Sequence, residues 1–355
     1  MWPYWLLLLI PAYLAVSRLN PIPPAVLMTQ SDRWPAVWWG MFFVLVLMIG
    51  WRHEVGGDWA AYISNMELTR PQGYADPGFS LLYWLGRTTG GGIYLVNLIC
   101  AAIFSWGLLD FCRTQPRPWL ALTVAVPYLI VVVAMGYTRQ SVGIGLSLIG
   151  VVALGRGNIL RCLFWFGLAV VFHKSAIIMV AIAIVVNTKN RVFTMICIGV
   201  LVFVLYYFFL QEAIDHLFRH YFGDEYQSSG AVFRIAMNAL PAVLFLMYRK
   251  RFQLTREQHK IWTWVALSAL LLVVALNVSP SSTAIDRVAL YWIPLQLFAL
   301  SHLPNILGRR SGKNVVWVCV VVALSVMVLF VWLFFGPFSK FWLPYQFYPW
   351  VWLWQ

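Results

Sequence analysis

Residues 315–335 of this 355-residue chain read VVWVCVVVALSVMVLFVWLFF, an apolar run without a single charge. A helix needs about 20 apolar residues to cross the hydrocarbon core of a bilayer, and this run supplies them on every face. Residues 124–135 are also apolar on every face, whereas the strands of a transmembrane barrel alternate in hydrophobicity over about ten residues. Both runs therefore predict membrane-spanning helices.

The composition extends this interpretation to the whole chain. Hydrophobic residues make up 62% of it and charged residues only 10%, whereas an ordinary soluble domain is about 45–50% apolar. We predict an all-α, polytopic integral membrane protein with about 12 transmembrane or re-entrant helices in a single transmembrane domain, residues 1–355. The approximate spans are residues 2–16, 35–51, 91–111, 119–137, 140–155, 162–172, 175–186, 192–210, 235–248, 261–276, 288–303 and 314–335.

The first run and the cysteines indicate neither a signal peptide nor a disulfide framework. Residues 2–16 follow no positively charged segment and end without a small-residue cleavage pattern, which predicts a retained span. The five cysteines lie in or beside apolar runs without paired spacing, so we expect buried free thiols rather than disulfides or a zinc site. They are Cys100, Cys112, Cys162, Cys197 and Cys319.

The sidedness follows from the distribution of charge among the loops. Sixteen of the 25 Lys and Arg residues fall in loops on one side, which is therefore predicted to be cytoplasmic. The other side receives nine of the 12 acidic residues and forms periplasmic loops near 52–90 and 211–234. The net charge of +13 is thus mostly a cytoplasmic feature, which indicates contact with anionic lipid rather than nucleic acid.

One step of this topology depends on residues 162–186. They could form a single helix with His173 and Lys174 near its centre, but that would reverse every later segment and export ten basic residues. We therefore predict a broken or re-entrant hairpin with His173 and Lys174 at its outer turn. Such a break is tolerated where the backbone lines a cavity.

Ionisable residues from separate segments collect on the predicted outer side. Taken singly, Arg139 or Lys174 could snorkel to the lipid headgroups, and Asp286 with Arg287 could be a local ion pair. Together, cations among membrane spans indicate an anion site. The acid-rich loop 211–234 could cap it, and the aromatic residues of 335–355 fit an interfacial belt or, alternatively, stacking on sugars. The clusters lie at Arg52 to Asp58, Asp76, Arg139, His173-Lys174 and Asp286-Arg287.

This ring of cations fits transfer from a lipid-linked donor with an anionic leaving group. A diphosphate needs fixed cations around its oxygens, which Arg provides as a fork and Lys as a point charge. An acceptor hydroxyl needs a base, for which Asp58 or His173 would serve. We find no metal-ligand spacing, phosphate-binding glycine loop or nucleophile motif, and we expect no cofactor.

The same residues resemble a known family. Their pattern is similar to the EpsG-like branch of the Wzy-type polysaccharide polymerases over roughly residues 35–300, and Phe172-His173-Lys174-Ser175-Ala176 is its most specific element. The other matching pieces are Arg52 with Gly56-Gly57-Asp58 and Tyr62, Pro77-Gly78-Phe79, Arg139-Gln140, and Asp286-Arg287 with Tyr291.

The resemblance implies a GT-C-like glycosyltransferase of the bacterial inner membrane. It would join undecaprenyl-diphosphate-linked oligosaccharide units on the periplasmic face, without metal or nucleotide, alongside a chain-length regulator and a flippase. Arg52, Arg139, Lys174 and Arg287 would bind the diphosphates, and Asp58 or His173 would be the base. Other substrate contacts would be Tyr62, Gln140, Asp286, Tyr291 and Arg234.

Two other classes of protein remain open. A lipid-linked oligosaccharide flippase would also need outward cations, but it should show repeated halves and a matching inward-facing charged site. A membrane O-acyltransferase could use His173, but it would need an inner polar constellation to receive a cytoplasmic acyl donor. The sequence gives no sign of repeated halves, of an inward-facing charged site or of an inner polar constellation.

Overall fold

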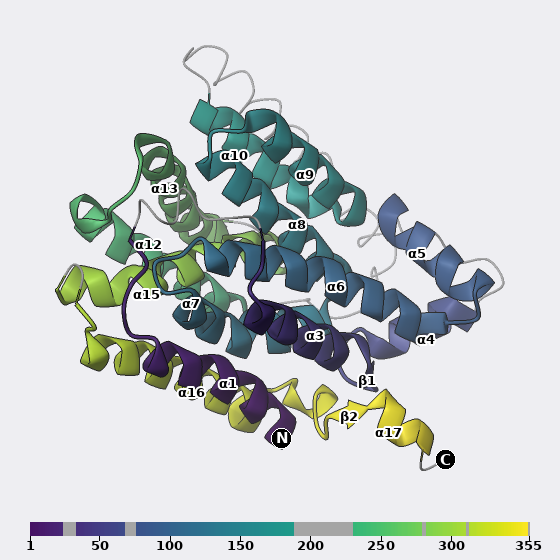
Figure 1. The fold of residues 1–355 in the computed structure, drawn as a ribbon. Helices are drawn as coiled ribbons and strands as arrows, with labels where there is room; N and C mark the ends of the chain where they lie inside the picture. The colour runs from purple at the N-terminus through teal and green to yellow at the C-terminus, as the bar shows by residue number, and fades with distance from the viewer. Residues whose placement is uncertain (24–32, 68–75, 188–229, 279–281, 310–311, 354–355) are drawn as a thin grey trace.

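The computed structural model describes residues 1–23, 33–67, 76–187, 230–278, 282–309 and 312–353. Figure 1 shows helices throughout, and the strands of the described part are two residues each. The predicted span 192–210 and most of the predicted cap 211–234 lie outside the described residues. Within them, the all-α prediction is confirmed.

Five described helices are long and apolar enough to cross a membrane, so the chain is a multi-pass membrane protein. The expectation of about 12 spans is not confirmed by this measure, because other apolar helices are shorter. A helix of 16 residues rises about 24 Å, less than the roughly 30 Å of a hydrocarbon core. The long ones are α6 (Gly92–Arg113), α8 (Thr138–Gly155), α12 (Ala231–Tyr248) with its 3-10 turn Arg249–Arg251, α13 (Arg256–Val278) and α16 (Val315–Phe335). The shorter ones are α1 (Trp2–Ser17), α3 (Ala36–Gly50), α7 (Pro118–Ala125) with the π-turn Val126–Ala134, α9 (Ile159–Phe172) and α10 (Ile177–Asn187).

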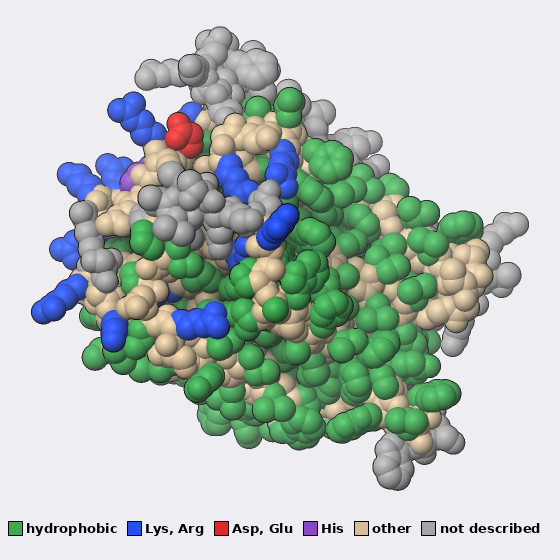
Figure 2. Space-filling model, in the orientation of Figure 1, with side chains coloured by type: hydrophobic (Ala, Val, Ile, Leu, Met, Phe, Trp, Pro, Cys, Tyr) green, Lys and Arg blue, Asp and Glu red, His purple; other side chains and the backbone are tan. Residues whose placement is uncertain are grey.

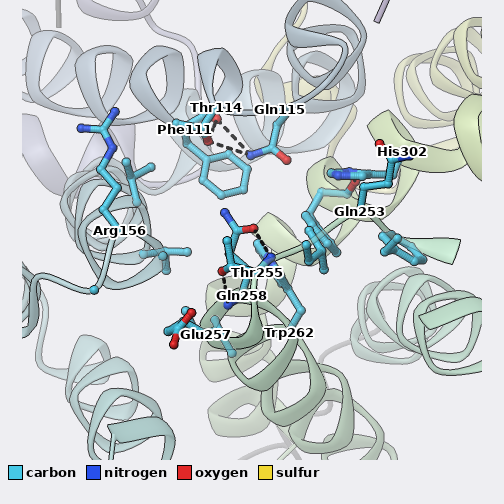
Figure 3. Close-up of a pocket in the computed structure, with 18 residues that line it drawn as sticks. Phe111, Thr114, Gln115, Arg156, Gln253, Thr255, Glu257, Gln258, Trp262 and His302 are labelled. Carbon is cyan, nitrogen blue, oxygen red and sulfur yellow. Dashed lines mark hydrogen bonds between the residues drawn. The ribbon is translucent and has the colours of Figure 1, made fainter. Parts of the chain in front are cut away.

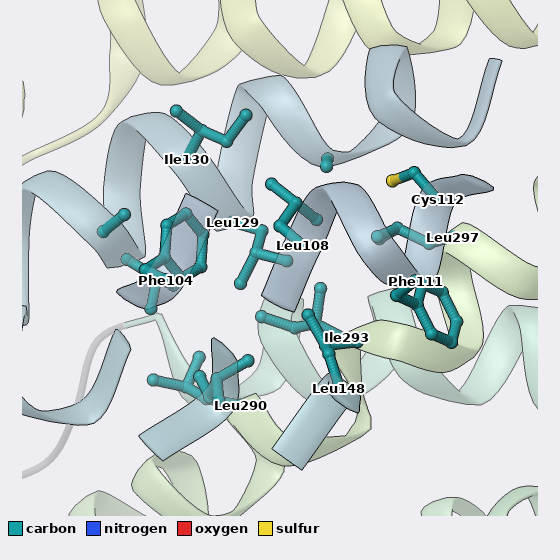
Figure 4. Close-up of a cluster of buried hydrophobic side chains, with 14 of the residues drawn as sticks. Phe104, Leu108, Phe111, Cys112, Leu129, Ile130, Leu148, Leu290, Ile293 and Leu297 are labelled. Carbon is teal, nitrogen blue, oxygen red and sulfur yellow. The ribbon is translucent and has the colours of Figure 1, made fainter. Parts of the chain in front are cut away.

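Helix α8 forms the centre of the molecule. Of its residues, 89% are buried, mainly against α6 and α9. The backbones of α6 and α8 approach each other so closely that a Cβ on Gly107 would lie 1.9 Å from the carbonyl oxygen of Gly145, so glycine is needed at this contact. Apolar side chains of α6, the π-turn and α8 fill the space around them with residues of α15 (Ile293–Leu307) (Figure 4).

Helix α16 lies at the periphery, beside α1 (Figure 1). Only five of its 21 residues are buried although it is the most apolar of the described helices, as expected for a helix that faces lipid. This position explains an error in the cysteine prediction: Cys319 on α16 is exposed, whereas Cys100, Cys112 and Cys162 are buried free thiols. Cys197 lies outside the described residues.

Residues 162–186 form two helices rather than one. Helix α9 ends at Phe172, His173 is extended (φ −157°, ψ 115°), and the 3-10 turn Lys174–Ala176 opens α10. The two helices pack against each other and lie side by side (Figure 1). The predicted broken hairpin with His173 and Lys174 at its turn is therefore confirmed.

The loops segregate to two ends as the charge distribution predicts. The inner end joins the loops near 18–22, 113–117, 249–260 and 305–314: the Ile22 amide donates to the Pro116 carbonyl (2.8 Å), and Arg117 donates to Asn305 and Gly312. Figure 2 shows Lys and Arg gathered over one end of a largely hydrophobic face. The outer end holds residues 52–58, 76, 136–140, 173–174 and 286–287. Which end faces the periplasm stays a prediction.

The predicted loop 52–90 is largely helical at this outer end. It contains α4 (Trp59–Glu67) and α5 (Pro77–Thr88), and α5 packs against α6 and α9. Two further short elements belong to the same end: α14 (Ser282–Ala289), which leads through the 3-10 turn Leu290–Trp292 into α15, and the C-terminal α17 (Tyr348–Leu353).

Candidate functional site

Arg139 lies at the centre of the outer end, in the first turn of α8. The helix begins there because the chain breaks at Tyr137 (φ −122°, ψ 67°), after the π-turn. The Arg139 guanidinium forms an ion pair with Asp76 (Nη1 to Oδ2, 2.9 Å) and lies 5.9 Å from the Phe79 ring. Its side chain is nevertheless 30% exposed, so this cation is held in place and still accessible.

Asp76 joins three separate elements at this point. It occupies the N-cap position of α5, but its side chain makes no capping bond there. Instead Oδ2 accepts from Arg139 and Oδ1 accepts from the backbone amide of Lys174 (3.3 Å). Because the carboxylate is 6% exposed, its two bonds fix the Arg139 guanidinium and the backbone at Lys174 relative to α5.

Asp58 and Tyr62 extend this network along α4. The Tyr62 hydroxyl donates to Asp58 Oδ2 at 3.4 Å and also contacts Arg139. Tyr62 is buried, and its backbone carbonyl accepts from the Tyr83 hydroxyl at 3.0 Å. The half-buried Asp58 carboxylate is thus placed on the Arg139 side of the outer end.

The electrostatics of the site separate its two candidate bases. Burial raises the pKa of Asp58, and the charges of Arg139 and Arg287 offset part of that effect. Burial, together with Arg139, Arg287 and Lys174, lowers the pKa of His173 to about 3. His173, at the turn between α9 and α10, is therefore a neutral imidazole at pH 7 and a weak base, whereas Asp58 is a stronger base than an ordinary aspartate.

His173 and Tyr291 each carry a buried polar atom without a partner in the part of the chain that the structure describes. Their rings are 6.5 Å apart, and neither His173 Nδ1 nor the Tyr291 hydroxyl has a hydrogen-bond partner among the described residues. Gly143 makes room for both, since a Cβ there would lie 2.7 Å from the Tyr291 hydroxyl oxygen and 3.3 Å from His173 Cβ. A buried donor without a partner costs free energy. The pair is therefore available to a polar group of a ligand.

Arg52 is more deeply buried than the other predicted cations. It is 1% exposed and donates to the carbonyls of Val55 (3.1 Å) and Ile49 (2.6 Å) and to Thr138 Oγ1 (2.7 Å). Burial lowers its pKa. These bonds tie the end of α3 to the residue before Arg139, which gives Arg52 a positioning role. Its direct contact with a diphosphate stays a prediction.

The remaining predicted residues lie where α8, α12 and α14 meet. Gln140 donates to the backbone carbonyl of Arg287, and Arg234 pairs with the buried Asp286. The Arg287 side chain is exposed and, within the described ranges, has no hydrogen-bond or ion-pair partner. Of the cations predicted to bind diphosphate, Arg139, Lys174 and Arg287 all lie close enough to His173 for their charges to lower its pKa.

Residues 341–348 of the C-terminal tail pack against the outer end, which the sequence did not indicate. We call this segment the clamp. Trp342 is 2% exposed and donates from Nε1 to the Val131 carbonyl (2.7 Å), so the expected interfacial belt is wrong for this residue. Strand β1 (Arg52–His53) pairs with β2 (Gln346–Phe347). Gly56 donates to the Phe341 carbonyl (2.9 Å) at φ +110°, and a Cβ there would lie 2.2 Å from the Met135 carbonyl oxygen. The turn before Asp58 thus requires glycine.

A cavity of about 730 Å³ lies at the inner end, between the ends of α6 and α8 and the start of α13 (Figure 3). Aromatic side chains including Trp262 and Phe298 line it together with Gln115, Arg156 and His302. Thr255 and Gln258 form a reciprocal capping box at its edge (both bonds 3.1 Å). Gln115, Arg156 and His302 are distant in sequence, and only the fold brings these polar residues together.

No metal site emerges from the described residues. Within those ranges, no three His, Cys, Asp or Glu side chains gather as metal ligands would. The chain does match a family model, that of the EpsG family, over residues 36–347.

The chain belongs to the EpsG family. This family is linked to exopolysaccharide biosynthesis. The EpsG match starts at the first residue of α3 and ends in β2, so it includes both the outer-end network and the strand pair of the clamp. No curated protein and no solved structure matches the chain.

Proposed function

We propose that this EpsG-family chain is a Wzy-type polysaccharide polymerase. It acts as a glycosyltransferase that joins undecaprenyl-diphosphate-linked oligosaccharide units on the periplasmic face of the bacterial inner membrane, in a GT-C-like fold of about 12 transmembrane or re-entrant helices. The observation that carries the proposal is Arg139, a cation fixed by the buried Asp76 and still exposed, with the backbone amide of Lys174 bonded to the same carboxylate. The family's link to exopolysaccharide biosynthesis supports the substrate class.

In the proposed reaction the donor diphosphate accepts hydrogen bonds from Arg139, Lys174 and Arg287. Its negative charge grows as the bond between the anomeric carbon and the diphosphate oxygen breaks, so fixed cations stabilise the transition state more than the ground state. A hydroxyl on the non-reducing sugar of the next lipid-linked unit attacks the anomeric carbon. The growing chain moves to that unit, and undecaprenyl diphosphate leaves.

We assign the base to Asp58 rather than His173. A base must be unprotonated and still bind a proton well, and burial raises the pKa of Asp58 while it lowers that of His173 to about 3. Neutral His173 and Tyr291 then act on the donor side, where their unpartnered polar atoms bind sugar or phosphate oxygens. Tyr62 positions Asp58, and Gln140, Asp286 and Arg234 hold the segment that carries Arg287.

The inner cavity favours a second candidate function. With Arg156 and His302 at the inner end and cations at the outer end, a lipid-linked oligosaccharide flippase has the two polar sites it needs. An O-acyltransferase could receive its acyl donor in the same cavity. The polymerase is preferred because Asp58 and the cations lie at one end, where transfer needs a base and an anion site together.

The decisive experiment uses purified protein and a defined undecaprenyl-diphosphate oligosaccharide without nucleotide. Polymerisation gives a ladder of longer glycans and one released undecaprenyl diphosphate for each bond formed. Folded protein that moves this lipid across a vesicle membrane without elongating it is a flippase. Protein that transfers an acyl group from a soluble donor, again without elongation, is an acyltransferase.

A further inference from the structure

A second group of cations lies at the inner end, in a groove between α12 and α13. The groove encloses about 350 Å³ and is lined by Arg249, Lys250, His259, Lys260, Thr263 and Trp264. Three of these carry fixed positive charges, and Arg249, Lys250 and Lys260 are exposed. This concentration of positive charge attracts an anion.

The helices next to the groove expose apolar stripes. On α12, Leu240 and Met247 are 72% and 70% exposed, and on α13 Leu271 is 66% exposed. Val243 and Leu267 continue these stripes at helical spacing, and Trp264 connects the second stripe to the groove. Both helices are long enough to span a bilayer. The stripes therefore run from the groove into the hydrocarbon region.

We propose that this groove binds an anionic glycerophospholipid of the adjacent leaflet. Its phosphate accepts hydrogen bonds from Lys250 and Lys260, and its acyl chains lie along the stripes of α12 and α13. A free phosphate would use the cations but not the stripes, and a neutral phospholipid would use the stripes but not the net charge. Trp264 fits the boundary, because its ring is amphipathic and 41% exposed.

Neighbouring contacts shape the groove without filling it. Arg251 points elsewhere: its guanidinium donates to the Ile306 carbonyl (3.1 Å) and lies 5.5 Å from the Tyr248 ring. It thereby fixes the turn that carries Arg249 and Lys250. Glu257 lines the separate inner cavity and not the groove.

The test measures binding of phosphatidylglycerol to the full-length protein in detergent, by native mass spectrometry or with a fluorescent analogue. A basic residue near an anionic headgroup contributes about fivefold in affinity, so Lys250→Gln with Lys260→Gln should weaken binding at least fivefold. The matched control is Arg309→Gln with Lys313→Gln, which removes two charges at the same end outside the groove. We expect it to change binding less than twofold.

Three results would overturn the proposal. Equal losses in the two double variants would show diffuse surface electrostatics, and no loss in the groove variant would show that the groove is not used. Displacement of the lipid by millimolar inorganic phosphate, with no effect of Met247→Ser and Leu271→Ser, would show a free-phosphate site. An unchanged melting temperature without lipid verifies that each variant is folded.

Discussion

The outer-end site and the inner-end groove hold their cations in different ways. In the outer-end site, Arg52 is buried and donates to Ile49, Val55 and Thr138, and the partly buried Arg139 is held by an ion pair with Asp76. At the inner end, Arg249 and Lys250 are exposed along a groove. Fixed cations suit a site that must recognise changing charge in a reaction, because they need no reorganisation. Exposed cations suit retention of a mobile anionic lipid.

The largest expected effect is at Asp58. If this carboxylate is the base, Asp58→Asn should lower the transfer rate by about 10²–10⁴-fold and leave donor binding nearly unchanged, because the amide keeps the shape but cannot accept a proton. In the unmodified protein the rate should rise with pH through the pKa of Asp58, above that of an ordinary aspartate, since the base acts when deprotonated. Turnover of the variant near that of the parent would eliminate this assignment.

Loss of the clamp should have the next largest effect, on stability. Trp342→Ala removes a buried ring and the bond to the Val131 carbonyl, so unfolding should require about 3–5 kcal/mol less. Trp352→Ala is the matched control, because Trp352 is 67% exposed and its loss should change stability by less than about 0.5 kcal/mol. Thermal unfolding in one detergent measures both. Equal effects would mean that the tail does not dock.

The clamp also shows where sequence reasoning ended. The apolar runs predicted the helical fold, since a span needs length. The distribution of Lys and Arg predicted the hairpin break at His173, since a single helix would export ten basic residues. Trp342 could not be distinguished from its neighbours Trp350 and Trp352, because aromatic density alone does not tell a buried ring from an interfacial one. Its docking depends on a contact with Val131, 211 residues away.

The inner cavity was missed for the same reason. Gln115, Arg156 and His302 come from different helices, each with an ordinary local role. The outer cluster was easier to predict, since Arg139, His173 and Lys174 interrupt apolar runs where charge is costly. The sequence placed Arg52 correctly at the outer end, but only the structure assigns its guanidinium to backbone carbonyls.

Arg139 provides a sharper test of the outer end. If Arg139 binds the donor diphosphate, Arg139→Gln removes that charged contact and leaves Asp76 buried without its partner, so transfer should fall about 30-fold or more. Arg139→Lys should restore little, because a point charge replaces a fork that reaches both Asp76 and a phosphate oxygen. Steady-state rates with the defined oligosaccharide measure both. A fully active Arg139→Gln protein at normal expression would remove Arg139 from the site.

The smallest effect is expected from an Arg→Gln substitution at the inner end, Arg156→Gln. Arg156 is exposed at the rim of the inner cavity, so Arg156→Gln should change stability by less than about 0.5 kcal/mol. If the outer end carries the reaction, the transfer rate should stay within about twofold of the parent, in contrast to Arg139→Gln. A flippase needs both sites, so Arg156→Gln should then slow lipid translocation as severely as Arg139→Gln does. Measuring elongation and translocation on these two variants thus tests whether the two ends serve one function or two.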